Sequence, residues 1–216
     1  MRIIHFSDFH LDADHLERAE SVINNMISSL KDIHQEKPIN LIIFSGDLID
    51  KAGKGFPNPQ MTKAFKKFSE IVIEPITSAL GLAKNRFVFT LGNHDLDQKA
   101  ETSKNNGLLT RKLSSIATVD RFMDGKDIQK KIPRTAEYNK YRDRYWKANK
   151  GEAEIHSTPF QLAVKIKIGD MKVGINLLNT AWRCYNSKTD KGKLLLGKNQ
   201  ITKEKNFSKI VVIVLQ

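Results

Sequence analysis

The sequence predicts an α/β fold built on a parallel or mixed β-sheet with helices packed against it. Short β-rich runs alternate with helical stretches in the first half of the chain. In the second half the apolar residues follow a strand-like period, and a two-residue turn joins two such runs. A β-α-β-α-β order followed by a hairpin is typical of such a sheet.

The first three elements are expected at 2–6, 16–33 and 40–45. The range 2–6 is a short strand run. The apolar run at 40–45 is continuous, as in a strand that is buried on both faces. The range 16–33 predicts a helix because its apolar residues recur at helical spacing. These residues are Leu16, Ala19, Val22, Ile23, Met26, Ile27 and Leu30.

A second helix is expected at 61–80, where Pro75 ends or kinks it because proline lacks a backbone N–H. A third strand is expected at 86–91. The polar range 98–154 favours helices, and we interpret it as a helical insert in a single domain that spans residues 1–216.

Strands are predicted for the second half of the chain. The ranges 160–168 and 171–179 flank Gly169-Asp170, which predicts a hairpin with a two-residue turn. A final buried strand is expected at 209–215.

Aromatic and basic residues are interleaved at 134–150. At helical spacing the aromatic residues predict an amphipathic packing face, and the alternative is a surface on which exposed bases stack. The aromatic residues are Tyr138, Tyr141, Tyr145 and Trp146.

The chain carries a formal net charge of +12, with 36 Lys and Arg against 24 Asp and Glu. Such an excess favours polyanionic partners, nucleic acid first, and a solvated lysine-rich surface is the alternative. No apolar run approaches the roughly 20 residues that span a bilayer, so no membrane partner is expected. Cys184 is the single cysteine, which fits a reducing compartment, and we expect a cytoplasmic protein.

Each of the first three strand runs ends in a polar cluster: Ser7-Asp8-Phe9-His10, Gly46-Asp47-Leu48-Ile49-Asp50 and Gly92-Asn93-His94-Asp95. Open α/β sheets place their sites beyond the carboxyl ends of the strands, so these clusters should converge in space. One such cluster alone is typical of a turn. Three of them with complementary ligand chemistry predict a metal site.

Two divalent cations suit these residues. Asp8 and His10 can bind one cation together, and this mixed donor set favours Mn²⁺, with Fe²⁺ or Zn²⁺ as alternatives. The Asp47 carboxylate can bridge two cations, and Asn93 supplies a carbonyl oxygen to the second. Such a centre activates water and stabilises charge on a phosphoryl group, which indicates phosphoester hydrolysis.

His94 and Asp95 are the expected catalytic residues. Protonated His94 can give its proton to the leaving oxygen, and Asp95, next in sequence, is expected to fix the tautomer of His94.

Together, the motifs D-x-H, G-D-x-x-D and G-N-H-D at these three positions resemble the N-terminal signature of calcineurin-like metallophosphoesterases. The resemblance implies a mixed β-sandwich flanked by helices in four layers. It also implies that Asp8 and His10 bind the first metal, that Asp47 bridges and that Asn93 binds the second metal. His94 would contact the substrate phosphate, and Asp50 would hold the loop.

Members of that family continue past the strand corresponding to 209–215 into further histidine ligands, which this sequence does not contain. We therefore expect a C-terminally incomplete domain. A partner chain, or self-association at the C-terminal strand, would then complete the site or cover an unpaired sheet edge.

Two functions follow as hypotheses. The first is a metal-dependent phosphodiesterase or nuclease-like enzyme that acts on a phosphoester substrate. The alternative is a catalytically impaired module that keeps the fold and binds nucleic acid or a protein partner.

Overall fold

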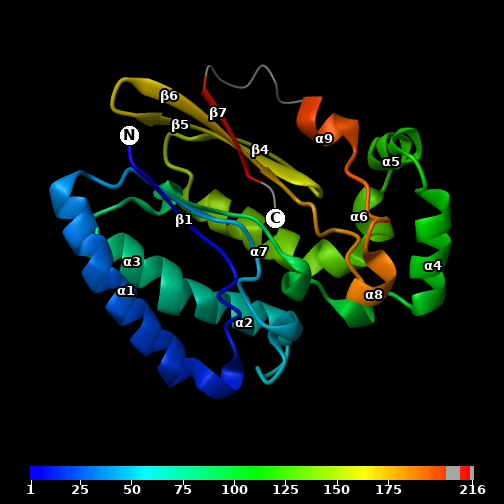
Figure 1. Ribbon diagram of the computed structural model, residues 1–216, viewed down its shortest axis with the longest axis horizontal. Helices are drawn as coiled ribbons and strands as arrows, with labels where there is room; N and C mark the ends of the chain where they lie inside the picture. Colours follow the sequence, from blue (N-terminus) through cyan, green and yellow to red (C-terminus); the bar gives the residue numbers. More distant parts are fainter. Residues whose placement is uncertain (203–209, 215–216) are drawn as a thin grey trace.

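The computed structural model describes residues 1–202 and 210–214. Its first half forms a three-stranded parallel sheet in the order β1-β2-β3 (Figure 1). All four residues of β2 are buried, as expected for the central strand. The strands and the helices that connect them are β1 (Ile3–Phe6), α1 (Leu16–Glu36), β2 (Leu41–Phe44), α2 (Gln60–Phe68), α3 (Glu74–Ala79) and β3 (Phe87–Phe89).

Pro75 does not end the second helical segment. A π-helical turn at Ser69–Ile73 joins α2 to α3, and the capping residues between them have right-handed helical backbone angles. A π turn within a helix locally replaces the regular i→i−4 hydrogen bonds without ending the helix. The proline therefore lies in the first turn of α3, where its missing N–H breaks no bond within that helix.

The second half forms a four-stranded sheet in the order β4-β5-β6-β7. The predicted hairpin is present as β5 (Gln161–Ile168) and β6 (Met171–Leu178), joined through Gly169 with a φ of 57°. β7 (Ile210–Val214) pairs parallel with β6, and the other residues of the expected strand lie outside the described residues. β4 (Glu154–Thr158), which the sequence did not predict, pairs antiparallel with β5.

One hydrophobic core joins both sheets to α1, α2, α3 and α7 (Ala136–Asn149). On α7, Tyr138, Tyr145 and Trp146 are buried in this core, which confirms the packing interpretation of the aromatic residues. The α/β fold with parallel and antiparallel sheets is therefore confirmed. No helix in the described part of the chain is long and apolar enough to cross a membrane.

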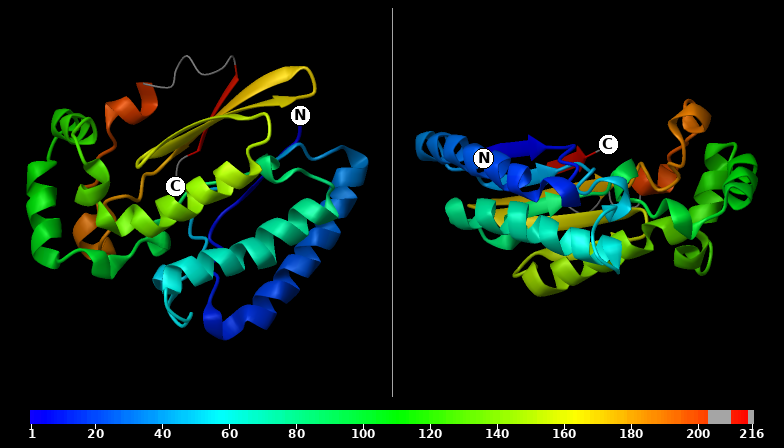
Figure 2. Two further views of the ribbon diagram at one scale, coloured as in Figure 1. Left: turned by 180° about the vertical axis from the view of Figure 1, so that it is seen from behind. Right: turned by 90° about the horizontal axis from the view of Figure 1, so that it is seen from below.

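The remaining helices lie at the end of the molecule away from α1, as all views show (Figure 2). A second, smaller core packs there around Trp182, which contacts Phe122 and Phe160. The helices of this end are α4 (Ser103–Lys112), α5 (Ile116–Met123), α6 (Ile128–Lys131), α8 (Ser187–Asp190) and α9 (Lys198–Thr202).

Arg134, just before α7, connects that helix to the end of the molecule that contains α4 and α8. Its guanidinium is 2% exposed, lies 2.9 Å from the Glu101 carboxylate and donates to the Cys184 carbonyl and to Asn106 Oδ1. We expect Arg134→Ala to lower the free energy of unfolding by about 2–3 kcal/mol, because Glu101 would stay buried without its cation. Thermal unfolding followed by circular dichroism measures this. The exposed Arg144→Ala is the charge-matched control, and an equal effect in both variants would contradict the prediction.

Candidate metal centre

The three polar clusters converge at the carboxyl ends of β1, β2 and β3. The loops after β1 and β2 run side by side, because the Asp8 N–H donates to the Gly46 carbonyl at 3.0 Å and the His10 N–H to the Asp47 carbonyl at 2.9 Å. A bridge between Leu11 and Ile49 continues this pairing beyond the strands. The sheet thus extends into the site and fixes the backbone of both loops.

Three of the expected metal ligands have left-handed backbone conformations. The φ angles are 60° for Asp8, 50° for His10 and 54° for Asp47. This region is uncommon for residues other than glycine, and each instance costs on the order of 1–3 kcal/mol. Such strain clusters at functional sites, where the rest of the fold maintains it.

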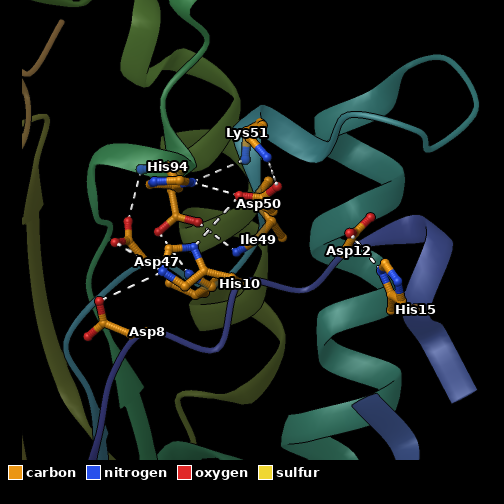
Figure 3. Close-up of polar contacts among 11 residues, drawn as sticks. Asp8, His10, Asp12, His15, Asp47, Ile49, Asp50, Lys51 and His94 are labelled. Carbon is orange, nitrogen blue, oxygen red and sulfur yellow. Dashed lines mark hydrogen bonds and ion pairs between the residues drawn. The ribbon is translucent and has the colours of Figure 1, made fainter. Parts of the chain in front are cut away.

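His10 lies among three carboxylates in the centre of the site (Figure 3). Its Nε2 is 3.8 Å from Asp8 Oδ1 and 3.8 Å from Asp47 Oδ2, and its Nδ1 is 3.8 Å from Asp50 Oδ1. These distances exceed those of hydrogen bonds. They leave room for a cation between His10 Nε2 and the carboxylate oxygens of Asp8 and Asp47.

The ligand atoms of His10, Asp47 and His94 all lie within 4.8 Å of one another, and the two imidazole rings meet edge to face with centroids 4.4 Å apart. Asp47 is 4% exposed, and its Oδ1 also accepts a 2.8 Å hydrogen bond from the His94 backbone N–H. Carboxylate and imidazole donors of this kind fit Mn²⁺, Fe²⁺ or Zn²⁺.

Asn93 and Asp8 reach this centre from another side. Both residues, together with Asp47 and Cys184, line a pocket of about 480 Å³. Burial raises the pKa of the Cys184 thiol to about 11, so the group is uncharged at neutral pH. The four expected ligands Asp8, His10, Asp47 and Asn93 therefore surround one region, and a divalent cation there would find oxygen and nitrogen donors on several sides.

The two remaining acidic residues differ from the expected arrangement. We expected Asp95 to orient His94, but it is Asp50 Oδ1 that lies 2.8 Å from His94 Nδ1 (Figure 3). Although burial of Asp50 opposes it, hydrogen bonds from Lys51 and His94 lower the pKa of this carboxyl. Asp50 therefore carries a negative charge beside the imidazole, which favours a protonated Nδ1.

Asp95 instead holds the loop after β2, the role that the sequence analysis gave to Asp50. Its fully buried carboxylate accepts hydrogen bonds from the backbone N–H groups of Leu48 at 3.1 Å, Ile49 at 2.9 Å and Gly92 at 2.8 Å. Burial raises the pKa of Asp95 to about 7, against the lowering effect of these three donors. Asp95 is adjacent to His94 in sequence, but its carboxylate contacts backbone N–H groups and not the His94 ring, so sequence proximity gave the wrong partner.

Lys51 is a site residue that the sequence analysis missed. Its Nζ lies 3.0 Å from Asp50 Oδ2, and its backbone has a left-handed φ of 41°. No motif pointed to Lys51, because a lysine after an aspartate is expected by chance in a sequence with 36 Lys and Arg.

Asp50→Asn is expected to lower kcat for phosphoester hydrolysis by about 10–100-fold with a smaller change in KM, because His94 would lose the charge that orients it. Steady-state kinetics measure this. Asp12→Asn is the matched control, since Asp12 pairs with His15 at 2.9 Å in an exposed pair that lies apart from the cluster (Figure 3). Equal losses in both variants would show that Asp50 does not act through His94.

A family model described as calcineurin-like phosphoesterase matches residues 1–197 of the chain. No curated protein and no solved structure gives a match. The matched range includes all three polar clusters, both sheets up to β6, and α7.

Proposed function

Because the chain belongs to the calcineurin-like phosphoesterase family, we propose that it hydrolyses phosphodiesters, with nucleic acid as the substrate class that its charge favours. The observation that carries this proposal is the convergence of His10, Asp47 and His94 at the carboxyl ends of three parallel strands. The family typically binds divalent metal ions, and two Mn²⁺ ions are proposed here.

Asp8, His10, Asp47 and Asn93 are the proposed metal ligands. When bound, divalent ions neutralise charge on the phosphoryl oxygens and supply hydroxide near neutral pH. The buried Asp47 is held by the His94 backbone N–H, and its carboxylate would be the ligand shared by the two ions. The left-handed backbone at Asp8, His10 and Asp47 fixes these three donors in advance, so that little reorganisation accompanies binding.

His94 is the proposed general acid. Its Nδ1 is bound to Asp50, which leaves Nε2 as the ring nitrogen that can give a proton to the leaving oxygen. The Asp50 carboxylate holds the ring through Nδ1, and the edge of the His10 ring limits the orientations of His94.

Hydrolysis of bis(p-nitrophenyl) phosphate with Mn²⁺ tests the function, with p-nitrophenyl phosphate as the monoester comparison. We expect metal-dependent release of nitrophenol that is faster from the diester and is lost with a chelator. A folded chain that binds Mn²⁺ by calorimetry but hydrolyses neither compound would overturn the proposal. That result would favour the alternative, a binding module.

A further inference from the structure

A second cavity, of about 680 Å³, adjoins the metal centre and shares Asn93 and His94 with it. Lys51 and Lys54 line it from the loop after β2, and Lys99 lines it from the segment after β3. The start of α2 and Tyr185 form other parts of its lining. A group bound at His94 therefore has direct access to a basic cavity.

The positive charge in this cavity is only partly compensated. Lys51 pairs with Asp50 at 3.0 Å. Two acidic residues also line the cavity, but Glu137 is held by Lys140 at 2.6 Å and by Thr62. Within residues 1–202 and 210–214, neither Lys54 nor Lys99 forms an ion pair.

The second acidic residue, Asp97, accepts a hydrogen bond from the Lys99 backbone N–H at 2.9 Å. Its side chain thus caps the start of the turn at Gln98–Ala100. Lys51, Lys54 and Lys99 outnumber Asp97 and Glu137 in the lining, so the cavity keeps a net positive charge that an anionic ligand can meet.

The loop that carries Lys51 and Lys54 is held in one path. Lys51, Ala52 and Gly53 have left-handed φ angles of 41°, 57° and 73° in succession. At Gly53 a Cβ atom would lie 2.7 Å from the Ala64 Cβ of α2, so only glycine allows this close packing. The backbone thus fixes the positions from which the Lys51 and Lys54 side chains extend into the cavity.

We propose that this cavity binds a second phosphate of the substrate, adjacent to the phosphoester that the metal centre receives. This inference rests on the proposed phosphodiesterase function and names its substrate class: a phosphodiester that carries a neighbouring anionic phosphate. Lys54 and Lys99 contact that phosphate, while His94 lies at the scissile one. A nucleic-acid strand and a small nucleotide with a terminal phosphate share this chemistry.

Calorimetry in the presence of a chelator tests the cavity without hydrolysis. The thymidine dinucleotide with a 5′-phosphate is expected to bind more tightly than the same dinucleotide without it. Lys54→Ala and Lys99→Ala should each reduce this affinity ratio by about 3-fold, and the double variant by about 10-fold, the range for ion pairs of exposed side chains. Lys172→Ala, an exposed lysine on β6, removes the same charge and should leave the ratio unchanged.

Equal affinity for the two dinucleotides, binding of neither, or an equal loss in Lys172→Ala would overturn the proposal. Thermal unfolding of each variant excludes misfolding as the cause.

A thymidine decamer distinguishes a nucleic-acid strand from a small nucleotide as the natural ligand. A strand is indicated if the decamer binds more tightly than the dinucleotide. The slope of log K against log salt concentration should then fall in magnitude by about 0.7 for each lysine removed. A decamer that binds no more tightly than the dinucleotide indicates a small nucleotide. If the aryl diester is not hydrolysed, the catalytic proposal fails while the binding result still stands.

Discussion

Asp47→Asn is expected to lower Mn²⁺-dependent hydrolysis of an aryl phosphodiester by at least about 100-fold. Loss of a residue that only supports a metal ligand costs about 10–100-fold in activity or metal affinity, and Asp47 is proposed as a ligand itself. It is the buried carboxylate between His10 and the His94 backbone. The variant removes the negative charge but keeps an oxygen that can accept from the His94 N–H, so the fold should be retained.

Two measurements distinguish loss of metal from loss of structure. Calorimetry should show weaker Mn²⁺ binding by Asp47→Asn, while its thermal unfolding without metal should stay close to that of the parent. Asp32→Asn on the exposed face of α1 is the charge-matched control and should keep full activity. Full activity in Asp47→Asn would remove this residue from the centre and contradict the proposed bridge.

Asp95→Ala should produce the largest loss of stability, about 3–5 kcal/mol in the free energy of unfolding. The change would leave three buried backbone N–H groups without an acceptor, and each such donor costs about 1–3 kcal/mol. In a domain of this size each kcal/mol shifts the melting temperature by about 2–4 °C, so a fall of about 10 °C is expected. Differential scanning calorimetry measures it.

Asp95→Asn serves as the matched variant. With its amide oxygen at the Oδ2 position it can still accept from Leu48 and Gly92, while the amide nitrogen meets the Ile49 N–H. We therefore expect a loss of about 1–3 kcal/mol, smaller than that of Asp95→Ala. If both variants had the melting temperature of the parent protein, the stability of the loop after β2 would not depend on this carboxylate.

The site residues illustrate how far local sequence information extends. Asp8, Asp47 and Asn93 were predicted to lie close together because each follows a strand-like run and parallel strands bring their carboxyl ends together, and the three residues line one pocket. The contacts of Asp50 and Asp95 were not identifiable in this way. Their side-chain directions depend on the turns at Gly46–Asp47 and Asn93–Asp95, which adjacency in sequence does not specify.

The sequence alone determined the order of strands and helices from β1 to β3, the hairpin through Gly169 and the convergence of three polar clusters, because hydrophobic periodicity and turn residues report directly on the local backbone. Only the tertiary structure decided that Asp50 orients His94, that Asp95 anchors the loop, and that Lys54 and Lys99 share a cavity with the centre. These contacts join segments that are far apart in sequence, and left-handed backbone at neighbouring residues such as Asp47 and Lys51 shapes the loop after β2. Such strain is maintained by the packed fold and leaves no periodic pattern in the sequence.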